Sequence, residues 1–381
     1  MIILHTESSP GWGGQELRIR AEVAEMRRRG HDVHLAVCAH GEFAKRLAAD
    51  GEPHHLLRFR HRFGLDTVLA LRGLIRRLGA TVLNTHSSTD SWAGALATRG
   101  LPGVTLVRTR HLSIPVKRNL LTRWLYTRPA AVVTTGEALR EQLIRDNSMS
   151  PGRLLSIATG FDPARFDPAT QDRAGMRAAL GIAADEPVVV MVAMVRPMKG
   201  HPVLVEAAPL VLKLVPRARF LVVGGCHDDN PMPAKLKQMA EANGSGARFI
   251  WAGQRQDIPA IYAASDVKVL PSVSDEGVPQ SLTQALAMGL PTVSTTVGAI
   301  GEIVEDGVTG WQVRPGDPVA LAAAIVQALT DQAEATRRAH AGQQRVLARY
   351  TVAAMAARTE ALYARLAAGR PAWPEEPLTT G

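Results

Sequence analysis

The sequence predicts an α/β protein of two doubly wound parallel-sheet domains, and three observations support this fold class. At 381 residues the chain exceeds the size at which a single core usually stops growing, so two domains are expected. Short apolar runs alternate with helical patterns in both halves, as they do in parallel βα units. The segment from Ala158 to Pro168 contains a glycine and two Asp-Pro steps, which is typical of a linker.

The first half, residues 1–163, is predicted to form an N-terminal Rossmann-like domain. Its apolar runs predict strands at Ile2–His5, Val33–Cys38, Val82–Thr85, Thr105–Thr109, Ala131–Thr134 and Leu155–Ile157. The helical patterns between them are Gln15–Arg29, Thr67–Leu78, Ser91–Arg99 and Glu137–Asp146.

The pattern restarts in residues 164–350, which predicts a second Rossmann-like domain of similar size. Its predicted strands are Val188–Val192, Arg219–Val223, Arg248–Trp251, Val267–Leu270, Thr292–Thr295 and Trp311–Val313. From Val319 onward the chain is almost entirely helical, with segments at Val319–Leu329, up to Tyr350, and at Thr351–Leu366. The tail, residues 369–381, has three prolines and no periodicity, so we expect it to be disordered.

Composition and charge narrow the possible functions. No run of about eighteen apolar residues occurs, so we expect no membrane span. The start, Met1 to His5, lacks the basic region of a signal peptide, and we expect a cytoplasmic protein. The whole net charge of +9 lies in residues 1–163, which hold 23 Lys and Arg against 14 Asp and Glu. An anionic partner is therefore expected to meet the N-terminal half.

The two cysteines indicate packing rather than chemistry. Cys38 and Cys226 fall in different halves, and each follows an apolar strand-like run. Buried packing is therefore the favoured interpretation for both, and two lone cysteines make no zinc site.

The stretch from Asp275 to Ala285 is the first candidate for a ligand site. It follows the predicted strand Val267–Leu270 and leads into a helical run. Glu276 before Gly277 places a carboxylate beside unpaired backbone N–H groups, and ligands bind open α/β sheets at the carboxyl ends of their strands. A simple helix cap is the alternative interpretation.

A second candidate is the turn Arg196-Pro197-Met198-Lys199-Gly200, which follows the predicted strand Val188–Val192. Arginine offers a fixed fork of donors and lysine a mobile point charge, and this pairing suits a diphosphate. Gly200 allows another backbone to approach closely. An ordinary solvated surface loop is the alternative.

The N-terminal half holds two weaker candidates. The loop Gly11–Glu16 follows the first strand and contains Gly13 and Gly14, which permit a ligand close to the backbone, although the dinucleotide pattern G-x-G-x-x-G is absent. His86 and His111 follow neighbouring predicted strands, so we expect both to face one crevice.

Together these motifs resemble glycosyltransferase family 4, a family of retaining enzymes with the GT-B fold. The resemblance runs from residue 1 to about residue 366. Its most specific segments are Arg196–Gly200, Pro271-Ser272 with Glu276–Pro279, Ala285–Pro291, and Asp306–Gly310 leading to Pro315–Pro318. Supporting matches are Gly13-Gly14 and Gly160–Asp162 with Phe166.

The resemblance implies two domains facing a central cleft, with residues 1–163 binding the acceptor and residues 164–350 binding a nucleotide-sugar. The helix at 351–366 is the segment placed to cross back to the N-terminal domain. The implied reaction is retaining transfer of a sugar from a nucleotide-diphosphate sugar to a glycan or glycolipid, in the synthesis of envelope polysaccharide or lipopolysaccharide. The resemblance implies no metal and no cofactor, and we interpret Asp228-Asp229 as a polar loop.

By motif match, Arg196 and Lys199 would clamp the donor diphosphate and stabilise the leaving nucleotide. Glu276 would hold the transferred sugar, and the amides of Gly277 and Val278 would meet phosphate or sugar oxygens.

On the N-terminal side, Gly13 and Gly14 would approach the phosphates or the acceptor when the domains close. His111 matches the cleft histidine that lies near the donor sugar in the family.

One position departs from the family pattern. Gln284 stands where the family has a second glutamate that contacts the ribose. Charged hydrogen bonds contribute roughly 1.5–3 kcal/mol and neutral ones about 0.5–1.5 kcal/mol, so we expect donor binding weaker by about 1 kcal/mol.

Two basic segments suggest how the acceptor is met. These are Arg58–Phe63 and Lys117–Tyr126. In the second segment, we expect four apolar residues to lie near one helical face, which are Leu120, Leu121, Trp124 and Leu125. The basic residues that flank this face are Lys117, Arg118, Arg123 and Arg128. Such a face suits an anionic membrane surface and therefore peripheral work at the cytoplasmic leaflet on a lipid-linked or anionic glycan. An ordinary core-facing helix with a basic solvated side is the alternative.

The sequence also allows other functions. A GT-B relative such as a sugar-nucleotide epimerase or a phosphorylase is one, although the Arg196, Lys199 and Glu276 pattern disfavours both. A catalytically weakened homologue that acts as a binding partner is another, because of Gln284. Nucleic-acid binding is suggested only by the high pI, and no recognition motif supports it.

Overall fold

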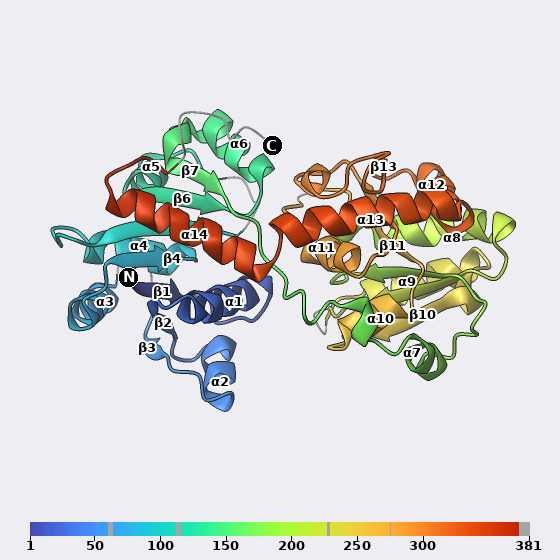
Figure 1. Ribbon diagram of the computed structural model, residues 1–381, viewed down its shortest axis with the longest axis horizontal. Helices are drawn as coiled ribbons and strands as arrows, with labels where there is room; N and C mark the ends of the chain where they lie inside the picture. The colour runs from blue at the N-terminus through green and yellow to red at the C-terminus, as the bar shows by residue number, and fades with distance from the viewer. Residues whose placement is uncertain (60–63, 112–115, 227–228, 275, 373–381) are drawn as a thin grey trace. The chain divides into compact units, whose positions relative to one another are not determined.

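The computed structural model of the chain describes residues 1–59, 64–111, 116–226, 229–274 and 276–372 (Figure 1). The chain divides into two compact units. One comprises Met1–Gly160 with Val352–Gly381, and the other comprises Phe161–Thr351. Each unit is built on a parallel sheet with helices around it, which confirms the predicted fold class.

The N-terminal unit has a seven-stranded parallel sheet in the order β3-β2-β1-β4-β5-β6-β7. The strands are β1 (Ile2–Glu7), β2 (Asp32–Cys38), β3 (His55–Leu57), β4 (Val82–Thr85), β5 (Thr105–Arg110), β6 (Ala131–Thr134) and β7 (Leu154–Ser156). The order reverses between β1 and β4, so the carboxyl ends of these two strands and of β5 form the switch point at which doubly wound sheets bind ligands.

Helices cover both faces of this sheet. They are α1 (Gly14–Arg28), α2 (Glu42–Ala49), α3 (Leu65–Leu78), α4 (Ser88–Ala97), α5 (Leu120–Thr127), α6 (Glu137–Asn147) and the returning α14 (Val352–Ala367). One core cluster joins the sheet to α3, α4, α5 and α6, and a second joins it to α1, α2 and α14. Apolar residues face both layers because a parallel sheet must be covered on both sides.

Two elements of this unit were not predicted. The strand β3 is three residues long and pairs only with β2, so its sequence is too short to show a period. The helix α2 is equally hard to detect because it has only eight residues, of which Phe43, Ala44 and Leu47 are buried.

The prediction for the last segment was correct for the helix but partly wrong for the tail. The helix α14 packs beside α1, and Tyr363 and Met355 are fully buried in the N-terminal core (Figure 1). Asn84 donates a 2.9 Å hydrogen bond to the Tyr363 hydroxyl, which ties α14 to β4. Ala372 is buried against the same core, so the predicted disorder does not hold for residues 369–372, and residues 373–381 lie outside the described residues.

The second unit has a six-stranded parallel sheet in the order β10-β9-β8-β11-β12-β13. Its strands are β8 (Val188–Val192), β9 (Arg219–Val223), β10 (Phe249–Gly253), β11 (Val267–Leu270), β12 (Thr292–Thr295) and β13 (Trp311–Val313). Its helices are α7 (Arg173–Ala179), α8 (His201–Leu214), α9 (Met232–Ala242), α10 (Ile258–Ala263), α11 (Gln280–Ala287), α12 (Pro318–Thr330) and α13 (Gln332–Arg349). The switch point lies between β8 and β11.

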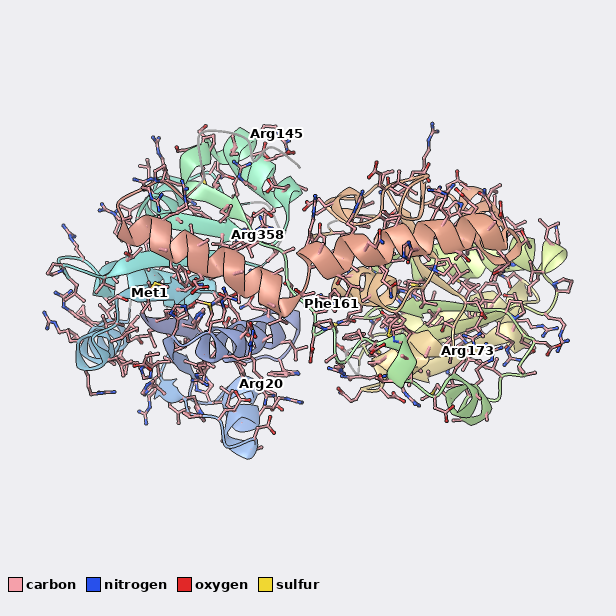
Figure 2. All side chains as sticks on the ribbon, viewed as in Figure 1. Met1, Arg20, Arg145, Phe161, Arg173 and Arg358 are labelled. Carbon is pink, nitrogen blue, oxygen red and sulfur yellow. The ribbon has the colours of Figure 1, made fainter. Side chains whose placement is uncertain are left out.

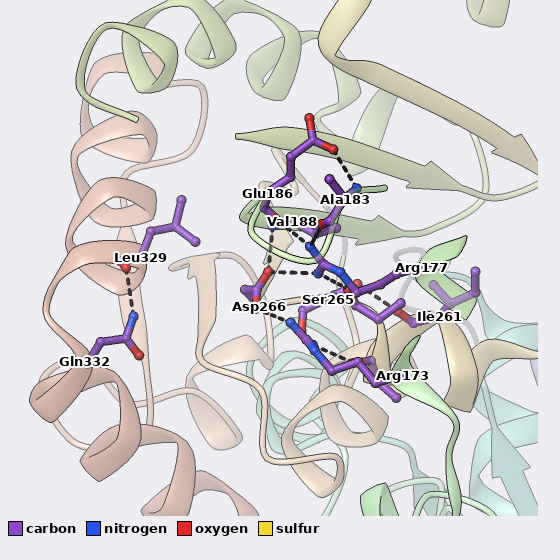
Figure 3. A network of polar contacts seen from close by, with 12 residues as sticks. Arg173, Arg177, Ala183, Glu186, Val188, Ile261, Ser265, Asp266, Leu329 and Gln332 are labelled. Atoms are coloured by element: carbon purple, nitrogen blue, oxygen red, sulfur yellow. Dashed lines mark hydrogen bonds and ion pairs between the residues drawn. The ribbon is translucent and has the colours of Figure 1, made fainter. Parts of the chain in front are cut away.

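A polar network holds the amino-terminal edge of this sheet (Figure 3). Asp266 accepts hydrogen bonds from the Val188 amide at 2.7 Å and from Arg173 Nη2 at 2.6 Å. The buried Arg177 donates to the backbone carbonyl oxygens of Ala183 and Ala264. These bonds anchor α7 beneath the strands, on the edge opposite the carboxyl ends.

The two cysteines differ in their burial. Cys38 is buried, as predicted, whereas the packing predicted for Cys226 is wrong because that residue lies exposed beyond the end of β9. Within the described ranges, we find no helix that combines the length and the apolar character needed to span a membrane.

Candidate active site

The turn Arg196–Gly200 lies at the switch point of the second sheet, directly against the end of β11. Pro197–Lys199 form a single 3-10 turn, and Gly200 has a φ of +74°. A Cβ atom at Gly200 would lie 1.7 Å from the Pro271 carbonyl oxygen, so no other residue fits there. The Val273 amide donates to the Met198 carbonyl at 2.8 Å and joins the two loops. This close contact explains why glycine is required at position 200.

The contact brings together two residues that stand 77 positions apart in the sequence. Lys199 Nζ lies 2.6 Å from Glu276 Oε1, and Ser272 Oγ donates to the same oxygen at 2.5 Å. Glu276 is 6% exposed, whereas the Lys199 side chain is 21% exposed. A buried carboxylate with a charged partner at a strand-to-helix turn is a rigid acceptor, and the more exposed lysine is free to change partner.

The remaining residues of this unit that are predicted to bind the donor lie in the same two loops and in α11. Arg196 is exposed, Gly277 and Gln284 are half-buried, and Val278 is 9% exposed. The helix α11 has Pro279 at its N-cap, and no side chain caps it there. Glu276 therefore is not a simple helix cap, and the first amides of α11 are available to a ligand.

Sequence reasoning missed two buried basic residues behind this site. Lys268 in β11 is fully buried and donates to the Val192 carbonyl at 3.3 Å. Burial, with the nearby charge of Lys199, lowers the pKa of Lys268 well below its usual value. His201 starts α8, and burial lowers its pKa to about 4. A lysine inside the apolar run Val267–Leu270 is a signal that could have been noticed, because lysine is rarely buried without a reason.

The N-terminal unit places Gly13 and Gly14 at the start of α1. Gly13 is the N-cap of this fifteen-residue helix, and no side chain satisfies its first amides. Gln15 Nε2 donates to the Glu7 carboxylate and, at 2.8 Å, to Ser87 Oγ. These bonds attach the glycine loop to the loop that follows β4.

Glu7 and Asp90 are two buried carboxylates at this edge of the sheet. Neither was predicted to be a site residue. Asp90 accepts from the amides of His86 and Ser87 at 2.8 and 2.9 Å, and Ser87 Oγ donates to Glu7 Oε1 at 2.5 Å. Burial raises the pKa of Glu7 to about 8, and the neighbouring Asp90 adds to this effect. Burial likewise raises the pKa of Asp90, to about 6. A polar residue directly after the apolar run of β1 is the only signal that could have indicated Glu7.

The two predicted histidines do meet at this edge. His86 Nδ1 lies 2.9 Å from His111 Nε2, and a third histidine, His5 in β1, continues the contact. The N-terminal unit therefore holds His111, Gly13 and Gly14, whereas Arg196, Lys199, Glu276 and Gln284 belong to the other unit.

Two further features bear on ligands. Across the described part of the chain, no group of three or more His, Cys, Asp or Glu side chains is arranged to hold a metal ion. A hollow of about 510 Å³ lies beside Asp266, Pro291 and His340, at the amino-terminal edge of the second sheet. It is remote from the candidate residues of this unit because they occupy the carboxyl ends of its strands.

Comparisons with known proteins identify the family of this chain. Residues 12–165 match the family model described as "Glycosyltransferase Family 4", and residues 172–345 match "Glycosyl transferases group 1". A D-inositol 3-phosphate glycosyltransferase of Geodermatophilus obscurus is 32% identical over 77% of this chain and 71% of its own length. The chain therefore belongs to glycosyltransferase family 4.

Other relatives match over less of their length or at lower identity. The D-inositol 3-phosphate glycosyltransferase of Rhodococcus jostii is 32% identical over 61% of this chain. The match spans only 55% of that protein's own length. A protein of Escherichia coli named UDP-Gal:alpha-D-GlcNAc-diphosphoundecaprenol alpha-1,3-galactosyltransferase is 26% identical over 70% of this chain and 71% of its own length.

Solved structures share the fold. A glycosyltransferase of Rickettsia africae superposes with a TM-score of 0.86 at 19% identity, over 96% of this chain and 99% of its own. Anabaena Alr3699/HepE, solved in complex with UDP, superposes with a TM-score of 0.83 at 22% identity, over 95% of this chain and 99% of its own. Together with the two parallel sheets, these likenesses confirm the predicted GT-B fold class.

Proposed function

We propose that this protein transfers a sugar, with retention of configuration, from a nucleotide-diphosphate sugar to a glycan or lipid-linked acceptor. The observation that carries the proposal is the 2.6 Å contact between Lys199 and Glu276 at the switch point of the second sheet. It places a cation suited to a diphosphate beside a carboxylate suited to sugar hydroxyls, at the edge where such sheets bind nucleotides.

The proposed chemistry follows from the charges of these residues. Lys199, which is partly exposed, turns from Glu276 to the donor diphosphate, and Arg196 adds a second cation. Both stabilise the negative charge that develops on the leaving nucleotide, which lowers the barrier to breaking the bond to the sugar. Glu276 keeps its hydrogen bond from Ser272 while it accepts from the sugar, so it stays in position when Lys199 leaves.

The other candidates take supporting roles. Gln284 on α11 bonds the donor ribose, the amides of Gly277 and Val278 contact its oxygens, and Gly13 and Gly14 offer the first amides of α1 to an anion. His111 contacts the donor sugar. No metal or cofactor is part of the proposed reaction.

A panel of UDP-, GDP- and ADP-sugars tests the donor half of the proposal. We expect one nucleotide class to raise the melting temperature, because a ligand that binds only the folded state stabilises it. We further expect slow release of the free nucleoside diphosphate without acceptor. Stabilisation by none of the three classes, with no release, would reject the proposal.

Gln284 favours one alternative function, that of a homologue with weakened catalysis that acts as a binding partner. Such a protein would bind a donor without releasing nucleoside diphosphate. Replacement of Gln284 by Glu separates the two, since a charged acceptor at the ribose should tighten donor binding several-fold. An unchanged affinity would show that Gln284 does not contact the ribose.

For the acceptor, we propose a lipid-linked or anionic envelope glycan met at the cytoplasmic face of a membrane. The support comes from exposed leucines at the start of two helices of one layer, α3 and α5, which both pack against α4. Leu65 and Leu69 in α3 are 70% and 62% exposed, and Leu120 and Leu121 in α5 are 83% and 57% exposed. The same stretches of the sequence carry exposed basic residues, which are Arg58, Lys117, Arg118, Arg123 and Arg128.

The predicted anchor face of α5 needs correction. Leu125 is buried in the core and Trp124 stacks on Trp92, so these two residues hold the helix to the protein and only Leu120 and Leu121 are exposed. The basic stretch at residues 60–63 lies outside the described residues. Elsewhere on this unit, arginines such as Arg145 also project from the surface (Figure 2).

Co-sedimentation with vesicles tests the surface. We expect binding to anionic vesicles at low salt, weaker binding at high salt, and little binding to neutral vesicles, because each basic residue near an anionic surface contributes about 1 kcal/mol. The double change Leu120→Ser with Leu121→Ser should reduce binding. The matched control is Leu214→Ser, which alters a leucine that is 69% exposed on α8 of the other unit. Equal binding to both kinds of vesicle, or equal loss in the control, would contradict the proposal.

A further inference from the structure

Three histidines form a continuous chain across the switch point of the N-terminal sheet. His5 lies in β1, His86 directly follows β4, and His111 directly follows β5, so three neighbouring strands contribute one ring each. His5 Nδ1 is 2.9 Å from His86 Nε2, and His86 Nδ1 is 2.9 Å from His111 Nε2. The ring centroids are 5.2 Å apart in both pairs. The middle ring therefore uses both of its nitrogens within the chain.

The chain runs from the interior toward the surface. His5 is fully buried, His86 is 4% exposed, and His111 is half-buried. Burial lowers the pKa of His5 to about 3 and the pKa values of His86 and His111 well below 6.5, so all three rings are neutral near pH 7. A neutral imidazole carries one N–H group and one bare nitrogen.

Neutrality leaves only two arrangements of the protons, because every link needs one donor and one acceptor. In the first, all three rings carry their proton on Nδ1, so His5 donates to His86 and His86 donates to His111. In the second, all three carry it on Nε2, so His111 donates to His86 and His86 donates to His5. The two arrangements differ at the ends of the chain, and the buried end distinguishes them.

His5 Nε2 is the buried end, and no hydrogen-bond partner faces it in the part of the chain that the structure describes. The second arrangement would leave a buried N–H group there without an acceptor, which is rare in proteins. The first arrangement leaves a bare nitrogen at this end, so the buried end favours the first arrangement.

We propose that His5 and His86 are positioning residues that hold His111 in its Nδ1–H tautomer, so that His111 presents a hydrogen-bond donor to a substrate oxygen. The proposal rests on the role of His111 in the proposed function, and it narrows that role. His111 Nε2 is occupied by His86, and Nδ1 carries a proton. His111 therefore donates to a hydroxyl or phosphate oxygen and does not act as a general base.

The tautomers can be measured in the full chain without any substrate. Protein labelled with ¹⁵N-histidine gives long-range ¹H–¹⁵N correlations in which a protonated and a bare ring nitrogen have distinct shifts. We expect Nδ1–H signals for His5, His86 and His111 near pH 7, assigned by their loss in single variants. An Nε2–H tautomer or a charged ring at any of the three would overturn the proposal.

Variants of His86 test the positioning role. His86→Phe removes the donor to His111 and should produce a mixture of His111 tautomers, with kcat/KM lowered about two- to tenfold, as expected for one neutral hydrogen bond. His86→Gln retains an amide that can donate to His111 Nε2 and should keep more activity and more of the Nδ1–H form. His34→Gln, in β2 of the same sheet, is the control and should change neither.

The outcomes separate this inference from the proposed function. If no nucleotide-sugar gives transfer, the proposed function fails, while the tautomer spectrum still tests the arrangement of protons on the three histidines. If transfer is found but His86→Phe and His86→Gln leave both the spectrum and kcat/KM unchanged, the positioning role is wrong. Should His86→Phe fail to fold, His5→Phe removes the far ring without touching His111, and an unchanged His111 tautomer in that variant would likewise contradict the proposal.

Discussion

Glu276 is held from two sides before any ligand arrives, by Lys199 at 2.6 Å and by Ser272 at 2.5 Å. The carboxylate is thus oriented in advance, and an oriented charged acceptor is worth more than a mobile one because less order is lost on binding. Its position at the end of β11 comes from the strand and from the turn that Gly200 permits.

Replacing Glu276 by Ala should therefore remove most of the proposed transfer activity. A charged hydrogen bond contributes roughly 1.5–3 kcal/mol, which corresponds to a loss of about tenfold to a hundredfold in kcat/KM. Steady-state kinetics with the donor found in the nucleotide panel gives the measurement. The matched control is Glu305→Ala, which removes a half-exposed carboxylate paired with Arg345 in the same unit. Full activity of the Glu276 variant would remove this residue from the site.

Lys268 predicts a dependence of stability on pH. Burial lowers its pKa in the folded protein, so between that pKa and about 10.5 the unfolded chain binds more protons than the folded one. The contribution of Lys268 to the free energy of unfolding therefore rises with pH through this window and is least favourable below it. Lys268→Met should raise the free energy of unfolding, on the order of 1 kcal/mol near pH 7 and less near pH 10.

Urea unfolding at both pH values measures this difference. Lys213→Met, on the exposed side of α8, is the control and should have almost no effect. If Lys268→Met instead lowered the free energy of unfolding equally at both pH values, the lysine would be stabilising through its packing and its bond to Val192, and the electrostatic account would be wrong.

At the scale of elements, close packing of helices on the sheet decides which substitutions are tolerated. The helix α4 lies so near the strands that a Cβ atom added at Gly94 would meet Thr85 Cγ2 at 2.7 Å and Leu83 Cδ2 at 3.2 Å. Gly73, in the middle of α3, has open space at the same position. The two glycines therefore differ in their surroundings although both lie within a helix.

Alanine at these two positions should therefore have opposite effects. Gly73→Ala should stabilise the protein by about 0.5–1 kcal/mol, because alanine is the better helix former. Gly94→Ala should destabilise it by about 1–3 kcal/mol, because the crowding at Thr85 outweighs the gain in propensity. Thermal unfolding of both variants measures the effects, and a stabilising Gly94→Ala would show that α4 can move away from the sheet.

The elements that the sequence predicted share a physical cause. Strands such as β8 and β11 are buried on both faces and appear as continuous apolar runs, so their bounds were found to the residue. The strand β3 has one neighbour and three residues, which leaves no period to detect. The predicted anchor face of α5 was wrong because Leu125 and Trp124 belong to the core, and spacing along a helix does not state which side meets the sheet.

At the scale of the whole molecule, the two units differ in how the chain completes them. The second unit is one continuous segment, Phe161–Thr351, whose first and last residues form a parallel bridge. The first unit needs a returning helix, α14, which covers buried residues of α1 and the sheet. A buried arginine, Arg18, also donates at 2.7 Å to the Ile157 carbonyl in the last segment before the division.

We predict that residues 161–351 fold when expressed alone, whereas residues 1–160 alone do not. Without α14, the fragment of residues 1–160 exposes the apolar surface that Met355, Leu362 and Tyr363 cover. Its folding then loses about 25 cal/mol of stabilisation for each Å² of that surface. Circular dichroism and thermal unfolding of each fragment give the test. The control joins Gly160 to residues 352–372 through a short glycine linker, which should restore cooperative unfolding. Cooperative unfolding of residues 1–160 alone would contradict the prediction.

The sequence alone determined the fold class, the division into two domains and the family, because these depend on periodicity and on contiguous motifs. It also pointed to Arg196, Lys199, Glu276 and His111, since each lies within a motif or directly after an apolar strand. The roles of these residues in binding a donor remain predictions.

Only the tertiary structure decided which side chains meet. Lys199 and Glu276 are 77 residues apart, and the contact exists because β8 and β11 are neighbours in the sheet. The chain of His5, His86 and His111 arises in the same way from the adjacency of β1, β4 and β5, and the burial of Lys268 from a strand covered on both faces. Strand order is set by packing between distant segments, and no local pattern of residues encodes it.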